Sequence, residues 1–261
     1  MFRKFRILVL FFVLANVVVG AWATRLRTTS WQRPLSVTIH VSNGDGSTAS
    51  AAYIDRLLAM DEDEVDEFFG DVERFFSREG ERYAAVPDEP VDIVFAGMRE
   101  ALPPALPRDG SMLAVMAWSL QLRFWSWRND DYDALQDGEI FVIYFDPART
   151  RTLAHSLGLQ KGLIGVVNAV AAPHMTAENH VVIAHELLHM VGAVDKYDPV
   201  SNAPRIPEGL AEPHREPRYP QRLAEIMAGR IALGPRQVEA PRSLDQVVIG
   251  EATAREIGWV D

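Results

Sequence analysis

The chain is 261 residues long, 48% of its residues are apolar, its net charge is −10, and it has no cysteine. This length fits one good-sized catalytic domain with an anchor, or at most two small domains, and the acidic balance argues against nucleic-acid binding, which requires basic patches. Without cysteine the chain has no disulfide bonds, no cysteine-ligated zinc and no cysteine nucleophile.

Residues 1–30 are predicted to be a signal anchor, a transmembrane helix that also directs export. A basic cluster precedes an apolar run over residues 7–24, which is at the short limit for a spanning helix and long for a signal-peptide core. The sequence Ala-Trp-Ala at 21–23 offers a cleavage site, but Arg25 and Arg27 follow at once and favour an uncleaved anchor. We expect membrane localisation with the rest of the chain on the periplasmic or extracellular side; the alternative is secretion after cleavage.

Between the anchor and residue 175, strands are predicted to alternate with helices. Short apolar or alternating runs bounded by turn residues predict strands at 35–41, 91–96, 139–145 and 163–172. Apolar residues at three- and four-residue spacing predict a helical region over residues 50–84, whose acidic residues form a solvated face.

Residues 112–127 fit two patterns. Trp118, Leu120, Leu122 and Phe124 alternate as in a strand. A helical face is formed equally well by Leu113, Met116, Leu120, Phe124 and Trp127. We favour a helix inserted between strands, with its aromatic residues in the core; the alternative is a membrane-proximal surface.

The residues that indicate a function lie on an apolar helix predicted before Gly192. This helix carries His185, Glu186 and His189. Side chains four residues apart lie on one helical face, so the two histidines can bind one metal ion, and Glu186 can hold a water without being a ligand. Three buried polar groups would cost about 1–3 kcal/mol each unless something binds them. The H-E-x-x-H pattern therefore predicts a zinc hydrolase, with Zn²⁺ as its cofactor.

The third metal ligand is expected after the turn at Gly192. A glycine there can end the helix in the left-handed conformation, so that the chain turns back and Asp195 approaches the metal. Alternatively, Asp195 belongs to a polar surface turn, and the ligand comes from the loop that follows. The candidates in that loop are Glu208, Glu212 and His214.

The complete string, H-E-x-x-H-x-x-G-x-x-D, resembles that of the metzincin clan of zinc peptidases, in which the last ligand is His or, in a minority, Asp. The resemblance covers roughly residues 165–227. It implies an α/β (α+β) fold of the zincin type: a twisted mixed sheet with an active-site helix, and a small C-terminal helical subdomain. The catalytic domain would span residues 31–261, with an upper subdomain at about 35–192 and a lower one at about 193–261.

Three further features follow from this resemblance. Met227 would form a methionine turn beneath the metal, although the residues around it also fit an amphipathic helix. Tyr197 and Tyr219 are candidates for a tyrosine near the metal. The strand at 163–172 would be the sheet edge that binds an extended substrate, unless it is simply a core strand. Apart from the resemblance, apolar residues after the candidate cap Ser243 predict a C-terminal helix at 243–259, which suits the same plan.

The expected activity is zinc-dependent hydrolysis of peptide bonds by a membrane-anchored metalloendopeptidase. His185, His189 and Asp195 would hold the metal, and Glu186 would act as the general base toward a peptide or protein substrate. The alternatives are a zinc amidase that does not act on proteins and a metal-stabilised, membrane-anchored binding module. An intact Glu186 favours an enzyme, since a purely structural site has no use for it.

Overall fold

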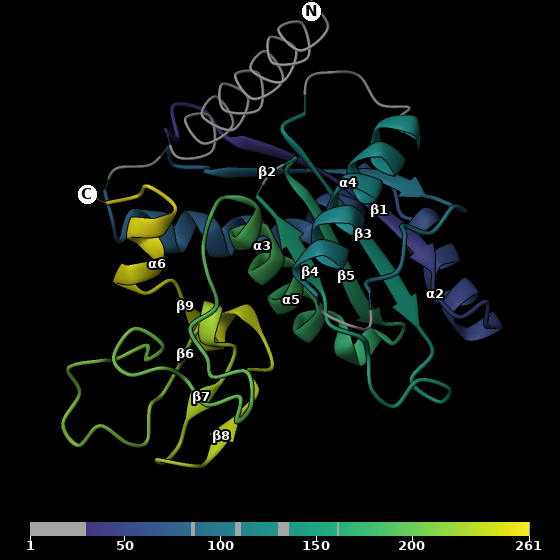
Figure 1. Cartoon of the computed structure of the whole chain (residues 1–261). Helices are drawn as coiled ribbons and strands as arrows, with labels where there is room; N and C mark the ends of the chain where they lie inside the picture. The colour runs from purple at the N-terminus through teal and green to yellow at the C-terminus, as the bar shows by residue number, and fades with distance from the viewer. Residues whose placement is uncertain (1–29, 85–86, 108–110, 130–135, 161, 261) are drawn as a thin grey trace, which may run out of the picture.

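A mixed five-stranded sheet forms the centre of the protein (Figure 1). The computed structural model describes residues 30–84, 87–107, 111–129, 136–160 and 162–260. The strand order is β2-β1-β3-β5-β4, in which the first four are parallel and β4 runs antiparallel to β5. The strands are β1 (Leu35–Asn43), β2 (Val91–Met98), β3 (Gly138–Phe145), β4 (Leu157–Leu159) and β5 (Ile164–Val170).

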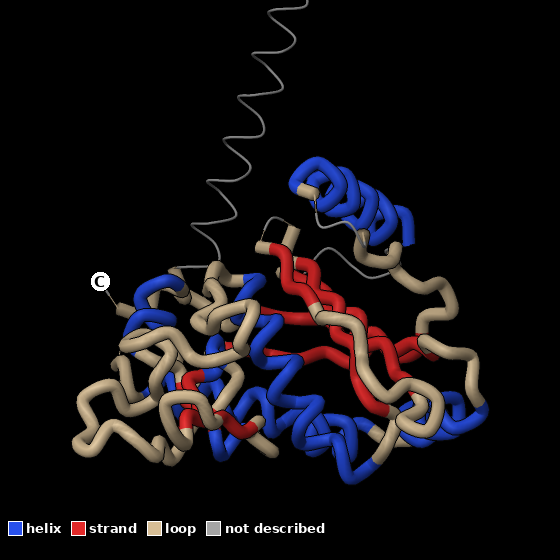
Figure 2. Tube along the Cα trace, turned by 60° about the horizontal axis from the view of Figure 1, so that its bottom comes forward, coloured by secondary structure: helices blue, strands red, loops and turns tan. Residues whose placement is uncertain are grey.

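Helices cover both faces of the sheet. The helices α2 (Thr48–Leu58), α3 (Glu62–Glu81) and α5 (Thr176–Met190) pack on one face, and α4 (Met112–Asn129) packs on the other (Figure 2). Parallel strands buried on both faces are nearly continuous apolar runs, which is the pattern of β3 and β5. The domain is therefore mixed α/β, as expected.

Alternation along β3 separates two apolar clusters. Ile140 and Val142 point into the large core beneath α3 and α5. Phe141 and Ile143 point the other way, toward the smaller cluster beneath α4. Successive strand residues face opposite sides of a sheet, so one strand supports both layers.

The C-terminal part after α5 is mostly loop. It contains the short strands β6 (Ala224–Glu225), β7 (Ile231–Ala232), β8 (Val238–Glu239) and β9 (Val247–Val248), and the 3₁₀ turns η2 (Ile226–Ala228) and η3 (Leu244–Gln246); another turn, η1 (Pro173–Met175), precedes α5. The continuous helix expected at 243–259 is wrong, because η3 and β9 occupy its first half. Only α6 (Glu251–Glu256) is helical there.

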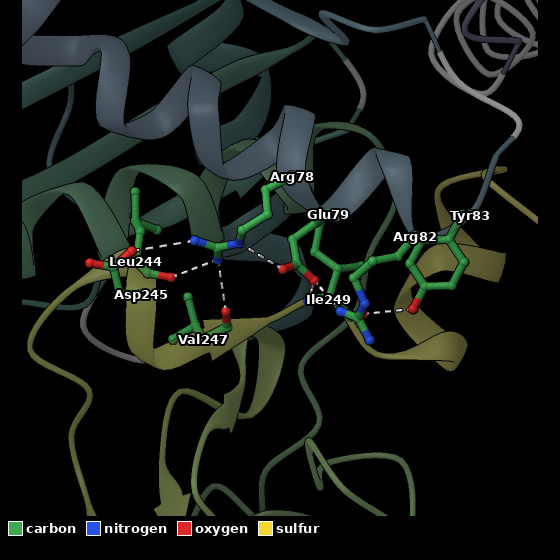
Figure 3. Close-up of polar contacts among 8 residues, drawn as sticks. All are labelled: Arg78, Glu79, Arg82, Tyr83, Leu244, Asp245, Val247 and Ile249. Carbon is green, nitrogen blue, oxygen red and sulfur yellow. Dashed lines mark hydrogen bonds and ion pairs between the residues drawn. The ribbon is translucent and has the colours of Figure 1, made fainter.

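Polar contacts fasten this C-terminal part to the end of α3 (Figure 3). The buried carboxylate of Glu79 accepts a hydrogen bond from the Ile249 N–H at 2.9 Å, and the Tyr83 hydroxyl donates to the Ile249 carbonyl at 2.7 Å. The Arg78 guanidinium donates to the carbonyls of Leu244 and Val247. Hydrogen bonds to charged groups are stronger than those between neutral groups. These contacts therefore hold residues 244–249 of the C-terminal part against the end of α3.

Two sequence predictions are corrected by the fold. The strand expected to bind substrate, 163–172, is not the sheet edge, because β5 lies between β3 and β4. The edge strand on this side of the sheet is β4, which lies between the strands predicted at 139–145 and 163–172. Residues 112–127 do form a helix, as favoured. Of its aromatic residues, which were expected in the core, Trp118 is buried and Trp125 packs against the core, but Phe124 and Trp127 are exposed.

The predicted transmembrane signal anchor is also corrected. No helix in the described ranges is long and apolar enough to cross a membrane. The segment on which that prediction fell, residues 1–30, lies outside those ranges except for its last residue.

Candidate metal centre

The active-site candidates sit on α5, which packs between the sheet and the C-terminal loops. Leu187, Leu188 and Ile183 are fully buried, so the apolar faces of the helix fix its rotation. His185 and His189, four residues apart, then project from the same remaining face, with ring centroids 4.8 Å apart. Both rings are partly exposed on the side of a cleft.

Asp195 joins the two histidines after a tight turn. Gly192 has φ +111, and the Ala193 N–H closes the helix end on the Leu188 carbonyl at 3.0 Å. The chain then reverses, and Asp195 Oδ1 lies 3.3 Å from His185 Nε2 and 3.2 Å from His189 Nε2. The three ligand atoms lie within 4.8 Å of one another, the one such group of at least three His, Cys, Asp or Glu found in the described ranges.

The alternative third ligands lie elsewhere. Glu212 forms an ion pair with Arg215 at 3.1 Å. Glu208 and His214 line a separate hollow beside Arg82 and α6. Asp195 is therefore the acidic residue that the fold brings to the histidine pair, as the sequence interpretation expected.

Backbone carbonyls orient both imidazole rings. His185 Nδ1 lies 3.0 Å from the Ile226 carbonyl oxygen, and His189 Nδ1 lies 2.9 Å from the Ala193 carbonyl oxygen. A carbonyl only accepts hydrogen bonds, so each Nδ1 carries the proton. Each neutral ring then presents its Nε2 lone pair toward Asp195, the arrangement that metal-ligating histidines adopt.

Glu186 lies beside the ligands without joining them. It is only 5% exposed, and its Oε2 has no hydrogen-bond partner within the described part of the chain. Burial raises the pKa of this carboxyl above its usual value, although the neighbouring histidines and a hydrogen bond from the Gly158 N–H act in the opposite direction. A buried carboxylate with an unused oxygen is suited to holding and deprotonating a water.

The electrostatics of the ligand group favour a cation. Burial alone would raise the pKa of Asp195, but the close approach of the His185 and His189 rings outweighs burial and lowers that pKa. Asp195 Oδ1 is buried and has no hydrogen-bond partner within the described part of the chain. Two imidazole nitrogens, a carboxylate oxygen and an unsatisfied second carboxylate fit a zinc ion with an open position for water.

The residues around the ligands form a cleft of about 890 Å³. Its walls come from residues 153–158 on one side and from residues 226–230 on the other, with α5 as the floor. Gly158 in β4 allows this packing, because a Cβ there would lie 2.2 Å from the Glu186 carbonyl oxygen. Tyr197 also lines the cleft, and burial and its hydrogen bond to Asp195 raise its pKa. Tyr219 does not line the cleft.

A tight turn around Met227 lies next to His185. Residues 226–228 form η2, Met227 is fully buried, and Gly229 takes a left-handed φ of +63. This geometry excludes the amphipathic helix considered as the alternative. The carbonyl that orients His185 belongs to this turn.

Glu225 was not singled out from the sequence. Its carboxylate, 0% exposed, accepts hydrogen bonds from the Ala228 N–H at 3.0 Å, the Thr253 hydroxyl at 2.6 Å and the Gly250 N–H at 3.3 Å. It therefore connects the turn at residues 226–228 to the start of α6. In the sequence, Glu225 is an acidic residue inside an otherwise apolar run. Its role could not be inferred from that position, because its hydrogen-bond partners include Gly250 and Thr253, far along the chain.

No family model and no curated protein matches this chain.

Proposed function

We propose that this protein is a zinc-dependent peptidase that hydrolyses peptide bonds in the cleft above α5. The observation that carries the proposal is the convergence of His185, His189 and Asp195 within 4.8 Å beside Glu186, whose Oε2 has no hydrogen-bond partner in the described part of the chain. A structural zinc site needs four closed ligands and no adjacent base. Three ligands plus a free carboxylate are instead the composition of a catalytic site.

The roles of the chain's own groups follow from their positions. Bound zinc would supply a Lewis acid and lower the pKa of an attacking water. Glu186 takes the proton of that water, and later returns it to the leaving amine. Asp195 offsets part of the cation's charge, and the carbonyls of Ile226 and Ala193 keep both imidazoles aimed at one point.

The edge of the sheet supports a peptide as the substrate. β4 pairs with β5 on one side only, and its residues line the cleft next to Glu186. An extended peptide can add to such an edge by main-chain hydrogen bonds. An amide substrate without an extended backbone could not use this edge.

We also infer that the centre is of the metzincin type. This inference is supported by the left-handed Gly192, the carboxylate that follows it by three residues, and the buried Met227 in the turn whose Ile226 carbonyl contacts His185. The mostly irregular part below the cleft takes the place of the lower, helical subdomain that the resemblance implies.

The test is cleavage of an unfolded protein by the full chain after zinc loading. We expect turnover that a chelator stops and zinc restores, and we expect Glu186→Gln to abolish turnover while zinc content stays near one ion per chain. Glu67→Gln, an exposed carboxylate on α3, is the matched control. Full activity of Glu186→Gln, or activity that survives complete metal removal, would disprove the proposal. Cleavage of small amides without proteolysis would favour the zinc amidase, and bound zinc without any turnover would favour a binding module.

A further inference from the structure

α4 has an apolar surface on both of its sides. One side packs on the sheet through Trp118 and Leu122, which are 4% and 0% exposed. The other side faces solvent, with large exposed side chains at three- and four-residue spacing. These are Leu113 at 79%, Met116 at 58%, Leu120 at 63%, Phe124 at 57% and Trp127 at 73% exposure.

These five side chains, called here the outer stripe of α4, lie along one line of the helix. Residues three and four apart are neighbours on a helical surface, so the stripe is continuous. A surface helix of a soluble domain normally turns polar residues outward, and a contiguous exposed apolar patch marks a contact site. Nothing in the described part of the chain covers the stripe, and Figure 2 shows α4 by itself on its face of the sheet.

The two charged side chains on α4 are both arginines. Residues 112–129 contain no aspartate or glutamate, although the chain as a whole has a net charge of −10. On a helical wheel, Arg123 lies on one side of the stripe and Arg128 lies on the other. Arg123 is half-buried and Arg128 is exposed. At the end of the helix the Arg99 guanidinium donates to the Asn129 carbonyl. A partner that matches this surface is apolar where it meets the outer stripe and negatively charged where it meets the arginines.

We propose that α4 is an interfacial helix that lies flat on an anionic lipid bilayer. The outer stripe enters the boundary between headgroups and acyl chains, and the arginines contact lipid phosphates. Aromatic residues such as Trp127 and Phe124 are favoured at that depth. The helix does not cross the bilayer; its other side stays on the sheet. This proposal stands apart from the proposed peptidase activity.

A second copy of the chain fits the stripe less well. Two outer stripes facing each other would place arginine borders together without any acidic residue on either helix to balance them. A bilayer of anionic lipid balances them directly. Because α4 and α5 lie on opposite faces of the sheet, lipid contact through α4 leaves the α5 side uncovered.

The test uses a probe at a single place in the full chain. The natural chain has no cysteine, so Leu120→Cys can carry one environment-sensitive fluorophore, with Ala117→Cys on the same exposed side as a second site. Glu67→Cys on α3, across the sheet, is the control. The labelled proteins are mixed with vesicles of phosphatidylglycerol and phosphatidylcholine that contain lipids with nitroxides at shallow or deep acyl positions. A thermal melt checks that each labelled variant is folded.

We expect quenching at 120 and 117, stronger with shallow than with deep nitroxides because the helix inserts roughly 5–10 Å, and no quenching at 67. The quenching at these two sites should be weaker with vesicles of pure phosphatidylcholine, and weaker in the double variant Arg123→Gln/Arg128→Gln. The double variant Met116→Ser/Phe124→Ser should show no quenching. Equal signals at 120 and 67, or no quenching at 120, would overturn the proposal. Protection of the 120 label without lipid that grows with protein concentration would also overturn it, and would assign the stripe to a second copy.

Discussion

The Nδ1 atom of His185 lies 3.0 Å from the carbonyl oxygen of Ile226, forty-one residues further along the chain. This contact makes the candidate metal centre depend on the turn at residues 226–228. The turn in turn depends on the buried carboxylate of Glu225, which accepts from the Ala228 N–H and from the Thr253 hydroxyl. A series of hydrogen bonds therefore connects α6 to the orientation of one imidazole ring.

Replacing Glu225 should weaken the metal centre from a distance. Glu225→Ala leaves the Ala228 and Gly250 N–H groups and the Thr253 hydroxyl without their buried acceptor, at about 1–3 kcal/mol for each group. We expect a lower free energy of unfolding and zinc affinity reduced by about 10–100-fold, as for other outer partners of metal ligands. Chelator competition measures the affinity.

Thr253→Val is the matched control for that variant, because it removes only one donor and leaves the turn bonded. Its zinc affinity should stay close to that of the natural chain. If Glu225→Ala binds zinc as tightly as Thr253→Val does, the Glu225 carboxylate does not position the centre.

Removing the Asp195 carboxylate should affect the metal more than any outer change. Asp195→Asn keeps the shape of the side chain but removes the charge that lies 3.2–3.3 Å from both Nε2 atoms. We expect its zinc affinity to fall by more than the roughly 10–100-fold associated with outer partners. Isothermal titration with zinc measures this, and Asp198→Asn is the control, since Asp198 bonds only within its own exposed turn. If Asp195→Asn and Asp198→Asn bind zinc with equal affinity, Asp195 is not the third metal ligand.

A methyl group at residue 158 should push β4 away from α5. In Gly158→Ala the added carbon would lie 2.2 Å from the Glu186 carbonyl oxygen and 2.6 Å from His189 Cβ. Overpacking against backbone costs typically about 1–3 kcal/mol, and we expect both a lower melting temperature and a large loss of peptidase turnover. At Gly234 an added carbon meets only Gln237 Cβ at 3.6 Å, so Gly234→Ala should melt like the natural chain. An unchanged melting temperature for Gly158→Ala would contradict this packing.

Asp45 should make the fold sensitive to acid. Its weak burial raises its pKa, but hydrogen bonds from the backbone N–H groups of Ser47 and Asp146 outweigh this and lower the pKa from 3.8 to about 2. A pKa depressed in the folded state contributes stability above the unfolded value, and this contribution is lost as pH falls from about 4 to 2. Asp45→Asn should therefore be less stable than the natural chain at neutral pH and equally stable near pH 2. Denaturant unfolding at both pH values measures the difference in the free energy of unfolding between the two chains, which we expect to be small because Asp45 is partly exposed to solvent. A difference that stays the same at both pH values would show that the charge of Asp45 is not its cause.

Local patterns were enough to identify the regular elements. The strands expected at 35–41, 91–96 and 139–145 are β1, β2 and β3, and every predicted end lies within two residues of the observed end. The helix before Gly192 and the shared face of His185 and His189 also follow from local spacing, because a helix repeats every 3.6 residues whatever surrounds it.

Tertiary structure decided what lies between those elements. Sequence spacing allowed Asp195, Glu208, Glu212 or His214 as the third member of the histidine group, and only the path of the chain after Gly192 brings Asp195 to them. The edge position of β4 and the role of Glu225 depend on partners far away in the sequence. The same is true of α4, which has large apolar residues on more than one side. Only its packing on β3 and β5 shows which side faces the sheet and which faces solvent.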